Sequence, residues 1–252
     1  MRNSLAGSAN KQGRAAGCSA AGGQLLFPGV LGTSIIKAGG LTCAWTGLNE
    51  AKCAELGYDF ETTYLYSSSS AGYYPGAGEM ITKITFLRGS GRLLGAQIAG
   101  RKGADKRIDV YATALYAGLT VFDLANLDLA YAPPYSSAHD PVVMSGMAAG
   151  NIVSGGVRSA SPFGFAERAK REGGVLLDVR SREEFDAGHL DGAVNFPIDG
   201  ARERLHELDR DKKYFVYCGV GYRGYVFCRM LSQKGYDAIN MSGGYFTATM
   251  DV

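Results

Sequence analysis

The sequence of 252 residues lacks the features that mark several specialised classes of protein. It contains no apolar run of about 18 residues or more, so we expect no helix that spans a membrane. Its net charge is only +2, which gives no strong field for a nucleic acid or a membrane surface, and neither partner is expected. Residues 1–12 carry no apolar stretch of signal-peptide length, and a cytoplasmic location is therefore the expectation.

Closely spaced metal-binding or disulfide-forming residues are also missing. The five cysteines are odd in number and form no Cys-x-x-Cys pair, and only three histidines are present. Such spacing fits neither a disulfide framework nor a zinc site, and no metal is expected. Three cysteines lie within helix or strand patterns and are predicted to be structural: Cys18, Cys43 and Cys53.

One stretch, residues 214–225, carries the pattern of a reactive site. A β-prone apolar run ends at Cys218, a turn with two glycines follows, and residues 224–234 have helical spacing. A thiol at such a turn lies near backbone N–H groups and the positive end of a helix dipole, which favour a thiolate. Arg223 adds a fixed positive charge, so Cys218 is predicted to be a nucleophile. The alternative is a buried cysteine that serves as a small hydrophobic residue.

The chain divides into two halves with different patterns. The first half predicts an α+β domain, in which an antiparallel sheet is followed by helices. The second half alternates short strands and helices, which predicts an α/β domain with a small parallel sheet and helices on both faces. A Gly- and Ser-rich linker is predicted at 155–161. The expected strands are 41–46, 60–66, 80–87, 93–98, 175–179, 194–196, 214–218 and 238–241. The expected helices are 48–56, 105–117, 121–127, 163–170, 182–187, 201–208 and 225–234. One more helix, the last of the first half, is expected to start at 140–141 and to end near 154–156. A further short helix, capped by Asn10, is expected to run to about Ala21 and to bury little.

Residues 162–252 resemble a rhodanese domain. The motifs that carry the resemblance are Leu177-Asp178-Val179-Arg180, Glu184-Phe185, Gly188-His189-Leu190, 192–197, the loop Cys218–Arg223 and Ser242-Gly243-Gly244. Phosphatases that share this fold have five residues between the cysteine and the arginine, whereas four stand between Cys218 and Arg223 here. The shorter loop suits one terminal sulfur and disfavours a phosphatase.

The resemblance implies a persulfide on Cys218 that is formed from a sulfane-sulfur donor and removed by a thiol acceptor. The loop residues expected to bind the persulfide are Gly219, Val220, Gly221, Tyr222 and Arg223. Gly219 departs from the larger polar residue that often follows the cysteine in this family. Asp178 and Arg180 are expected to tie the strand end to the loop, and His189 is expected to cap a turn.

Residues 25–154 resemble the dimerisation domain of flavin-dependent pyridine nucleotide–disulfide oxidoreductases, in the coenzyme A-disulfide reductase branch. The matching segments include 28–34, 45–49, 72–77, 94–100, 105–109 and 129–136, and residues 1–24 resemble the end of a flavin domain. We therefore expect a homodimer formed through residues 25–154. The resemblance also implies that Tyr73 and Tyr131 contribute to a redox site of the partner subunit; the alternative is that both are amphipathic interface residues.

The family uses FAD, NAD(P)H and coenzyme A, but no cofactor is expected in this chain alone. No Gly-x-Gly-x-x-Gly fingerprint is expected after a strand, and no counterpart of the family's redox cysteine is found. The leading interpretation is a rhodanese-type sulfurtransferase that belongs to the tail of a coenzyme A-disulfide or persulfide reductase. The alternative is a non-catalytic fragment that dimerises and binds a partner.

Overall fold

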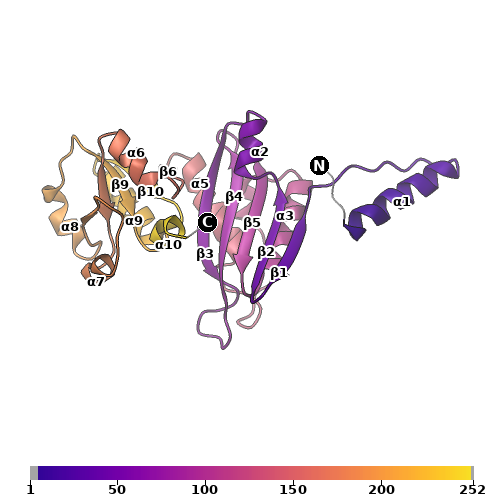
Figure 1. Ribbon diagram of the computed structural model, residues 1–252, viewed down its shortest axis with the longest axis horizontal. Coiled ribbons are helices and arrows are strands. Elements are labelled where there is room, and N and C mark those ends of the chain that lie inside the picture. The colour runs from indigo at the N-terminus through magenta and orange to yellow at the C-terminus, as the bar shows by residue number, and fades with distance from the viewer. Residues whose placement is uncertain (1–4, 251–252) are drawn as a thin grey trace.

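The computed structural model describes residues 5–250 and contains two five-stranded sheets of opposite character. The first is antiparallel and the second is parallel, so the predicted α+β and α/β halves are both confirmed. The second domain, the first sheet and the N-terminal helix follow one another along the long axis (Figure 1). Within residues 5–250, no helix is long and apolar enough to cross a membrane.

The first sheet has the order β1-β2-β5-β4-β3, with β3 at the edge nearest the second domain (Figure 1). Its strands are β1 (Ser34–Ala38), β2 (Leu41–Gly47), β3 (Phe60–Ser68), β4 (Glu79–Leu87) and β5 (Leu93–Gly100). Its helices are α2 (Glu50–Glu55), α3 (Ala104–Tyr116), α4 (Val121–Leu124) and α5 (Pro141–Val153). Apolar residues of α3, α4 and α5 form one buried core with the sheet, and this core includes Ile84, Phe86, Ile108, Leu124 and Val142.

The second sheet has the order β6-β10-β9-β7-β8. Its strands are β6 (Ser159–Ala160), β7 (Val175–Asp178), β8 (Val194–Asn195), β9 (Lys213–Tyr217) and β10 (Asp237–Met241). Its helices are α6 (Phe165–Arg171), α7 (Arg182–Asp186), α8 (Ala201–Arg204), the 3-10 turn η1 (Leu205–Glu207), α9 (Tyr222–Gln233) and α10 (Gly244–Ala248).

Helices cover both faces of the second sheet, as predicted. Residues of β9 alternate between two cores because successive side chains of a strand point to opposite faces. Val216 lies in the core that includes Phe227 of α9, and Phe215 lies in the core that includes Phe165 of α6.

The structure differs from the expected elements at several places. Helix α1 (Ala6–Ala20) begins at Ala6, with Leu5 as its N-cap, so the expected cap at Asn10 is wrong. Only Ala15 of α1 is buried, and the helix lies apart from the sheet (Figure 1). Strand β1 and helix α10 were not predicted, and β6 lies within the segment expected to be a linker, where it pairs with β10.

Candidate active site

Cys218 lies directly after β9, where the chain turns into α9. Gly221 is the N-cap of that helix and has a φ of +97°, a conformation that glycine adopts without strain. The turn folds back on the cysteine, and the backbone N–H of Gly221 donates to Cys218 Sγ at 3.2 Å. Helix α9 starts at Tyr222, three residues before the expected start at 225, so Arg223 lies in its first turn. The thiol, a helix N-terminus and a guanidinium therefore meet at one point.

Arg223 is held by the carboxylate of Glu184, a residue of the rhodanese motifs for which the sequence predicted no role at the cysteine loop. Its two terminal nitrogens donate to the two oxygens of Glu184, at 2.6 and 2.7 Å. The hydrogen bond from Arg223 lowers the pKa of Glu184, so the carboxylate is ionised at neutral pH. The pKa of Arg223 is raised, first by its hydrogen bond to Glu184 and in smaller part by the Cys218 sulfur. Glu184 is 39 residues from Arg223 in the sequence, so its place in the Glu184-Phe185 motif and in the capping box of α7 did not reveal this partner.

Two carbonyl groups of the cysteine loop accept hydrogen bonds from the start of α10. The N–H groups of Tyr245 and Phe246 donate to the carbonyl oxygens of Cys218 and Gly219, at 2.7 and 3.0 Å. Gly244 permits this close approach, because a Cβ at that position would lie 2.6 Å from the oxygen of Gly219. These bonds hold the two carbonyls toward α10, while the Gly221 N–H donates to the sulfur.

Residues 219–224 read Gly-Val-Gly-Tyr-Arg-Gly, so the expectation that no Gly-x-Gly-x-x-Gly follows a strand is wrong. The third glycine serves close packing of α9 on the sheet, since a Cβ on Gly224 would lie 2.5 Å from Asn240 Oδ1. The turn does not fit a dinucleotide. Its Gly221 N–H points at the sulfur, and residues 242–250, which follow β10 in the described part of the chain, contain no carboxylate for a ribose.

Asp178 and Arg180 form a buried ion pair at 2.6 Å. The guanidinium also donates to the carbonyl of Gly188 and lies 4.2 Å from the centre of the Tyr245 ring. The pair thus joins the end of β7 to the 188 turn and to α10, and Arg180 also lies 5.8 Å from the centre of the ring of Tyr217, the residue before Cys218. His189 lies against Phe185, and its Nδ1 is 3.0 Å from the Phe185 carbonyl, which matches a turn-capping role.

None of the other four cysteines accepts a hydrogen bond from the loop in the described part of the chain, although Cys228 shares a core with Cys218. Cys53 and Cys228 are buried, and Cys18 and Cys43 are half-buried. Burial raises the pKa of the Cys53 and Cys228 thiols, which keeps both protonated. Within residues 5–250, no group of histidine, cysteine or carboxylate side chains could hold a metal ion.

Tyr73 and Tyr131 come together although 57 residues separate them. Both side chains are exposed, at 79% and 51%. The pKa of Tyr131 is raised above its usual value, mainly through its interaction with the Tyr73 phenol. A backbone bond from Ala71 to the carbonyl of Pro133 joins the two loops that carry them. The pair therefore forms one exposed polar patch on the first domain.

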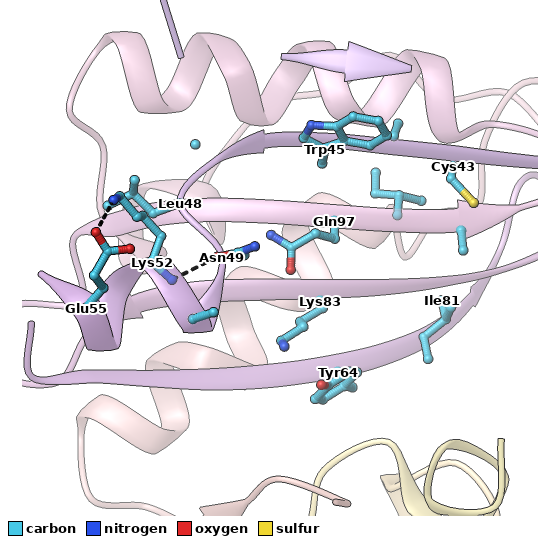
Figure 2. A pocket seen from close by; sticks show the side chains of 15 residues that line it. Cys43, Trp45, Leu48, Asn49, Lys52, Glu55, Tyr64, Ile81, Lys83 and Gln97 are labelled. Carbon is cyan, nitrogen blue, oxygen red and sulfur yellow. Dashed lines mark hydrogen bonds and ion pairs between the residues drawn. The ribbon is translucent and has the colours of Figure 1, made fainter. Parts of the chain in front are cut away.

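A hollow of about 720 Å³ lies on the open face of the first sheet, away from the cysteine loop. Figure 2 shows Trp45, Gln97, Lys83 and Tyr64, which form one row across β2, β5, β4 and β3. Lys83 pairs with Glu50 and lies 5.1 Å from the centre of the Tyr64 ring. The half-buried Cys43 is the only thiol among the residues that line the hollow.

Two families match the two domains. Residues 164–249 match the rhodanese-like domain, and residues 35–142 match the pyridine nucleotide-disulphide oxidoreductase dimerisation domain. The chain therefore contains a dimerisation domain of this oxidoreductase family followed by a rhodanese-like domain.

Proteins with similar sequences are coenzyme A-linked reductases. The NAD(P)H coenzyme A polysulfide/persulfide reductase of Pyrococcus horikoshii is 41% identical over 140 residues, which are 56% of this chain and 31% of that protein. The coenzyme A disulfide reductase of Staphylococcus haemolyticus is 37% identical over 128 residues, which are 51% of this chain and 29% of that protein. The chain spans about a third of the length of these relatives.

Two solved structures match nearly the whole chain. The reduced Bacillus anthracis CoADR-RHD gives a TM-score of 0.92 with 46% identity, over 97% of this chain and 44% of that one. A NAD-dependent persulfide reductase from A. fulgidus gives a TM-score of 0.81 with 41% identity, over 94% of this chain and 42% of that one. The arrangement of the two domains is thus similar to that in two experimental structures.

Proposed function

We propose that this chain carries a rhodanese-type sulfurtransferase whose nucleophile is Cys218. The observation that carries the proposal is the geometry of the loop, in which Sγ accepts from the Gly221 N–H at the start of α9 and Arg223 lies beside it. The loop residues from Gly219 to Arg223 would bind the persulfide, since backbone N–H groups and a guanidinium stabilise negative charge that develops on a terminal sulfur.

The reaction has two steps. The Cys218 thiolate attacks the sulfane sulfur of a donor such as thiosulfate; a new S–S bond forms, the old one breaks, and sulfite leaves with the electron pair. An acceptor such as a thiol or cyanide then attacks the terminal sulfur and takes it, and the thiolate is restored. Cys218 is 0% exposed, so groups around the loop must move to admit a donor.

The test is direct. After treatment with thiosulfate, the protein should gain the mass of one sulfur on Cys218, and cyanide should then release thiocyanate. Cys218→Ser should show neither, whereas Cys43→Ser, a half-buried thiol on the first sheet, should behave like the parent. A parent chain without a sulfur adduct, or a Cys218→Ser variant with the parent's activity, would refute the proposal.

The second candidate function is a non-catalytic module that dimerises and binds a partner. The complete burial of Cys218 favours it, because a thiol that no donor can reach would serve only packing. This candidate predicts a stable dimer with no turnover, so the same sulfur-transfer measurement separates the two.

The wider setting follows the relatives. We propose that the chain acts within a coenzyme A-disulfide or coenzyme A-persulfide reductase system, as a homodimer joined through residues 25–154. FAD, NAD(P)H and coenzyme A would then serve other parts of that system, and no step proposed for Cys218 uses them. Tyr73 and Tyr131 would face a redox site of the partner subunit, where their phenols could donate to a reacting sulfur.

A further inference from the structure

The two domains meet along β3, the edge strand of the first sheet. The backbone N–H of Tyr64 donates to Ser242 Oγ at 2.8 Å, and the hydroxyls of Thr63 and Ser242 lie 3.2 Å apart. Two residues after Tyr64 on the same strand, the Tyr66 hydroxyl lies 2.9 Å from Thr247 Oγ1. All three bonds start from β3, and all three reach one segment of the second domain, residues 242–247.

That same segment holds the cysteine loop. Tyr245 and Phe246 donate their N–H groups to the carbonyls of Cys218 and Gly219. Two glycines let the segment fit between strand and loop: a Cβ on Gly243 would lie 3.1 Å from Tyr64 Cβ, and a Cβ on Gly244 would lie 2.7 Å from the carbonyl carbon of Gly219. The contacts therefore run continuously from β3 through residues 242–247 to Cys218.

The direction of the Tyr66 hydrogen bond is fixed by its neighbours. Thr247 Oγ1 donates to the Gly243 carbonyl at 2.9 Å, so its lone pair accepts the proton of Tyr66. Burial raises the pKa of Tyr66, which keeps its proton in place across the neutral range. Tyr66 therefore stabilises the first turn of α10, whose N–H groups hold the loop.

We propose that Tyr66, on the first domain, is a positioning residue for sulfur transfer at Cys218, and that it acts through Thr247 and the start of α10. The inference rests on the proposed function of Cys218. It assigns the first domain a second task besides dimerisation, which is to hold the N–H groups of the loop toward the transferred sulfur. Loss of the bond lets α10 shift, and the transition state for transfer then loses part of the stabilisation that an ordered loop supplies.

The experiment is a double-mutant cycle on the full chain with Tyr66→Phe, Thr247→Val and the double variant. The measured quantity is the rate of persulfide formation on Cys218 from thiosulfate, by mass spectrometry, divided by the folded fraction from circular dichroism. Each single variant should lower this rate roughly threefold to tenfold, the range expected for one neutral hydrogen bond. Thr247→Val also removes the bond to the Gly243 carbonyl, so it should be the slower single variant. The double variant should be no slower than Thr247→Val, because that change already removes the bond of Tyr66.

Two controls separate positioning from general stability. Thr247→Ser keeps the hydroxyl and should restore a rate near the parent's. Tyr116→Phe removes a hydroxyl from a residue that is 79% exposed at the end of α3 and should leave the rate unchanged. Urea unfolding of every variant is measured in parallel.

The outcomes are distinct. Parent-like rates in Tyr66→Phe and Thr247→Val, effects that multiply in the double variant, or a lower urea midpoint with an unchanged rate per folded molecule would each overturn the inference. A parent chain that gains no sulfur would instead overturn the proposed function, and this inference with it.

Discussion

At the scale of single residues, the guanidinium of Arg223 lies beside Cys218 and pairs with the carboxylate of Glu184 on helix α7. Arg223→Gln removes the positive charge beside Cys218 and leaves Glu184 without its cation. The rate of persulfide formation should fall by about tenfold or more, since hydrogen bonds to charged groups are the stronger class. Arg223→Lys keeps the charge but not the paired donors, and its rate should lie between those of the parent and of Arg223→Gln.

The control for charge alone is Arg202→Gln, on the exposed surface of α8, which should transfer sulfur at the parent's rate. The Arg223–Glu184 pair also sets a pH dependence. The pKa of the Glu184 carboxyl in the folded chain lies below its ordinary value of 4.5. The pair therefore contributes to stability above pH 4.5, and this contribution is lost as the pH falls through the folded-state pKa of Glu184. Equal rates in the parent and in Arg223→Gln would contradict the role given to this guanidinium.

The residues of the loop itself could be predicted from sequence because they are contiguous. Cys218, two glycines and Arg223 stand within six positions, and the turn they predict is the turn observed. Glu184, Tyr66 and Thr247 could not be found in this way. Each acts through a contact that the tertiary fold makes across 39 or 181 residues, and no local pattern in the sequence reveals that contact.

At the scale of elements, α10 is a helix of five residues whose first residue, Gly244, has a φ of +65°. Gly244→Ala should lower the free energy of unfolding by about 1–2 kcal/mol for the left-handed backbone, and by about 1–3 kcal/mol more for the collision with the carbonyls of Cys218 and Gly219. It should also slow persulfide formation, because the loop must move.

The matched control is Gly235→Ala, with a φ of +82° and no atom closer than 3.9 Å to the added Cβ. It should show the backbone cost alone in urea unfolding and an unchanged rate of transfer. If the two variants lose equal stability and both keep the parent's rate, the close packing of α10 on the cysteine loop does not affect sulfur transfer.

Elements with strong local patterns were predicted, and those that depend on partners were not. The long strand β4 and the helix α9 appear close to their expected places because apolar periodicity specifies them. Strand β1 carries Ile35 and Ile36 side by side without alternation, and its register comes from pairing with β2. Helix α10 is too short to be stable alone and is held by its bonds to the cysteine loop.

At the scale of the whole molecule, the first sheet has a core on one face only. On the other face, Ile36 pairs with Cys43, and Cys43 and Trp45 line the hollow of Figure 2. Ile36, Leu41 and Trp45 remain exposed by 53%, 43% and 37%. Neighbouring apolar side chains exposed on one sheet face are typical of a surface that another protein covers. A second copy of this chain is the occupant that the dimerisation-domain family favours.

Light scattering should therefore give a mass near twice 26.7 kDa for the parent. Leu41→Lys places a charge in the expected contact, and since a buried unpaired charge costs several kcal/mol, the dimer should weaken by about a hundredfold or more. Tyr116→Lys adds the same charge at the exposed end of α3 and should leave the dimer intact. A monomeric parent would refute the homodimer, whereas a dimer that tolerates Leu41→Lys would place the contact elsewhere on residues 25–154. Circular dichroism of each variant ensures that the comparison is between folded chains.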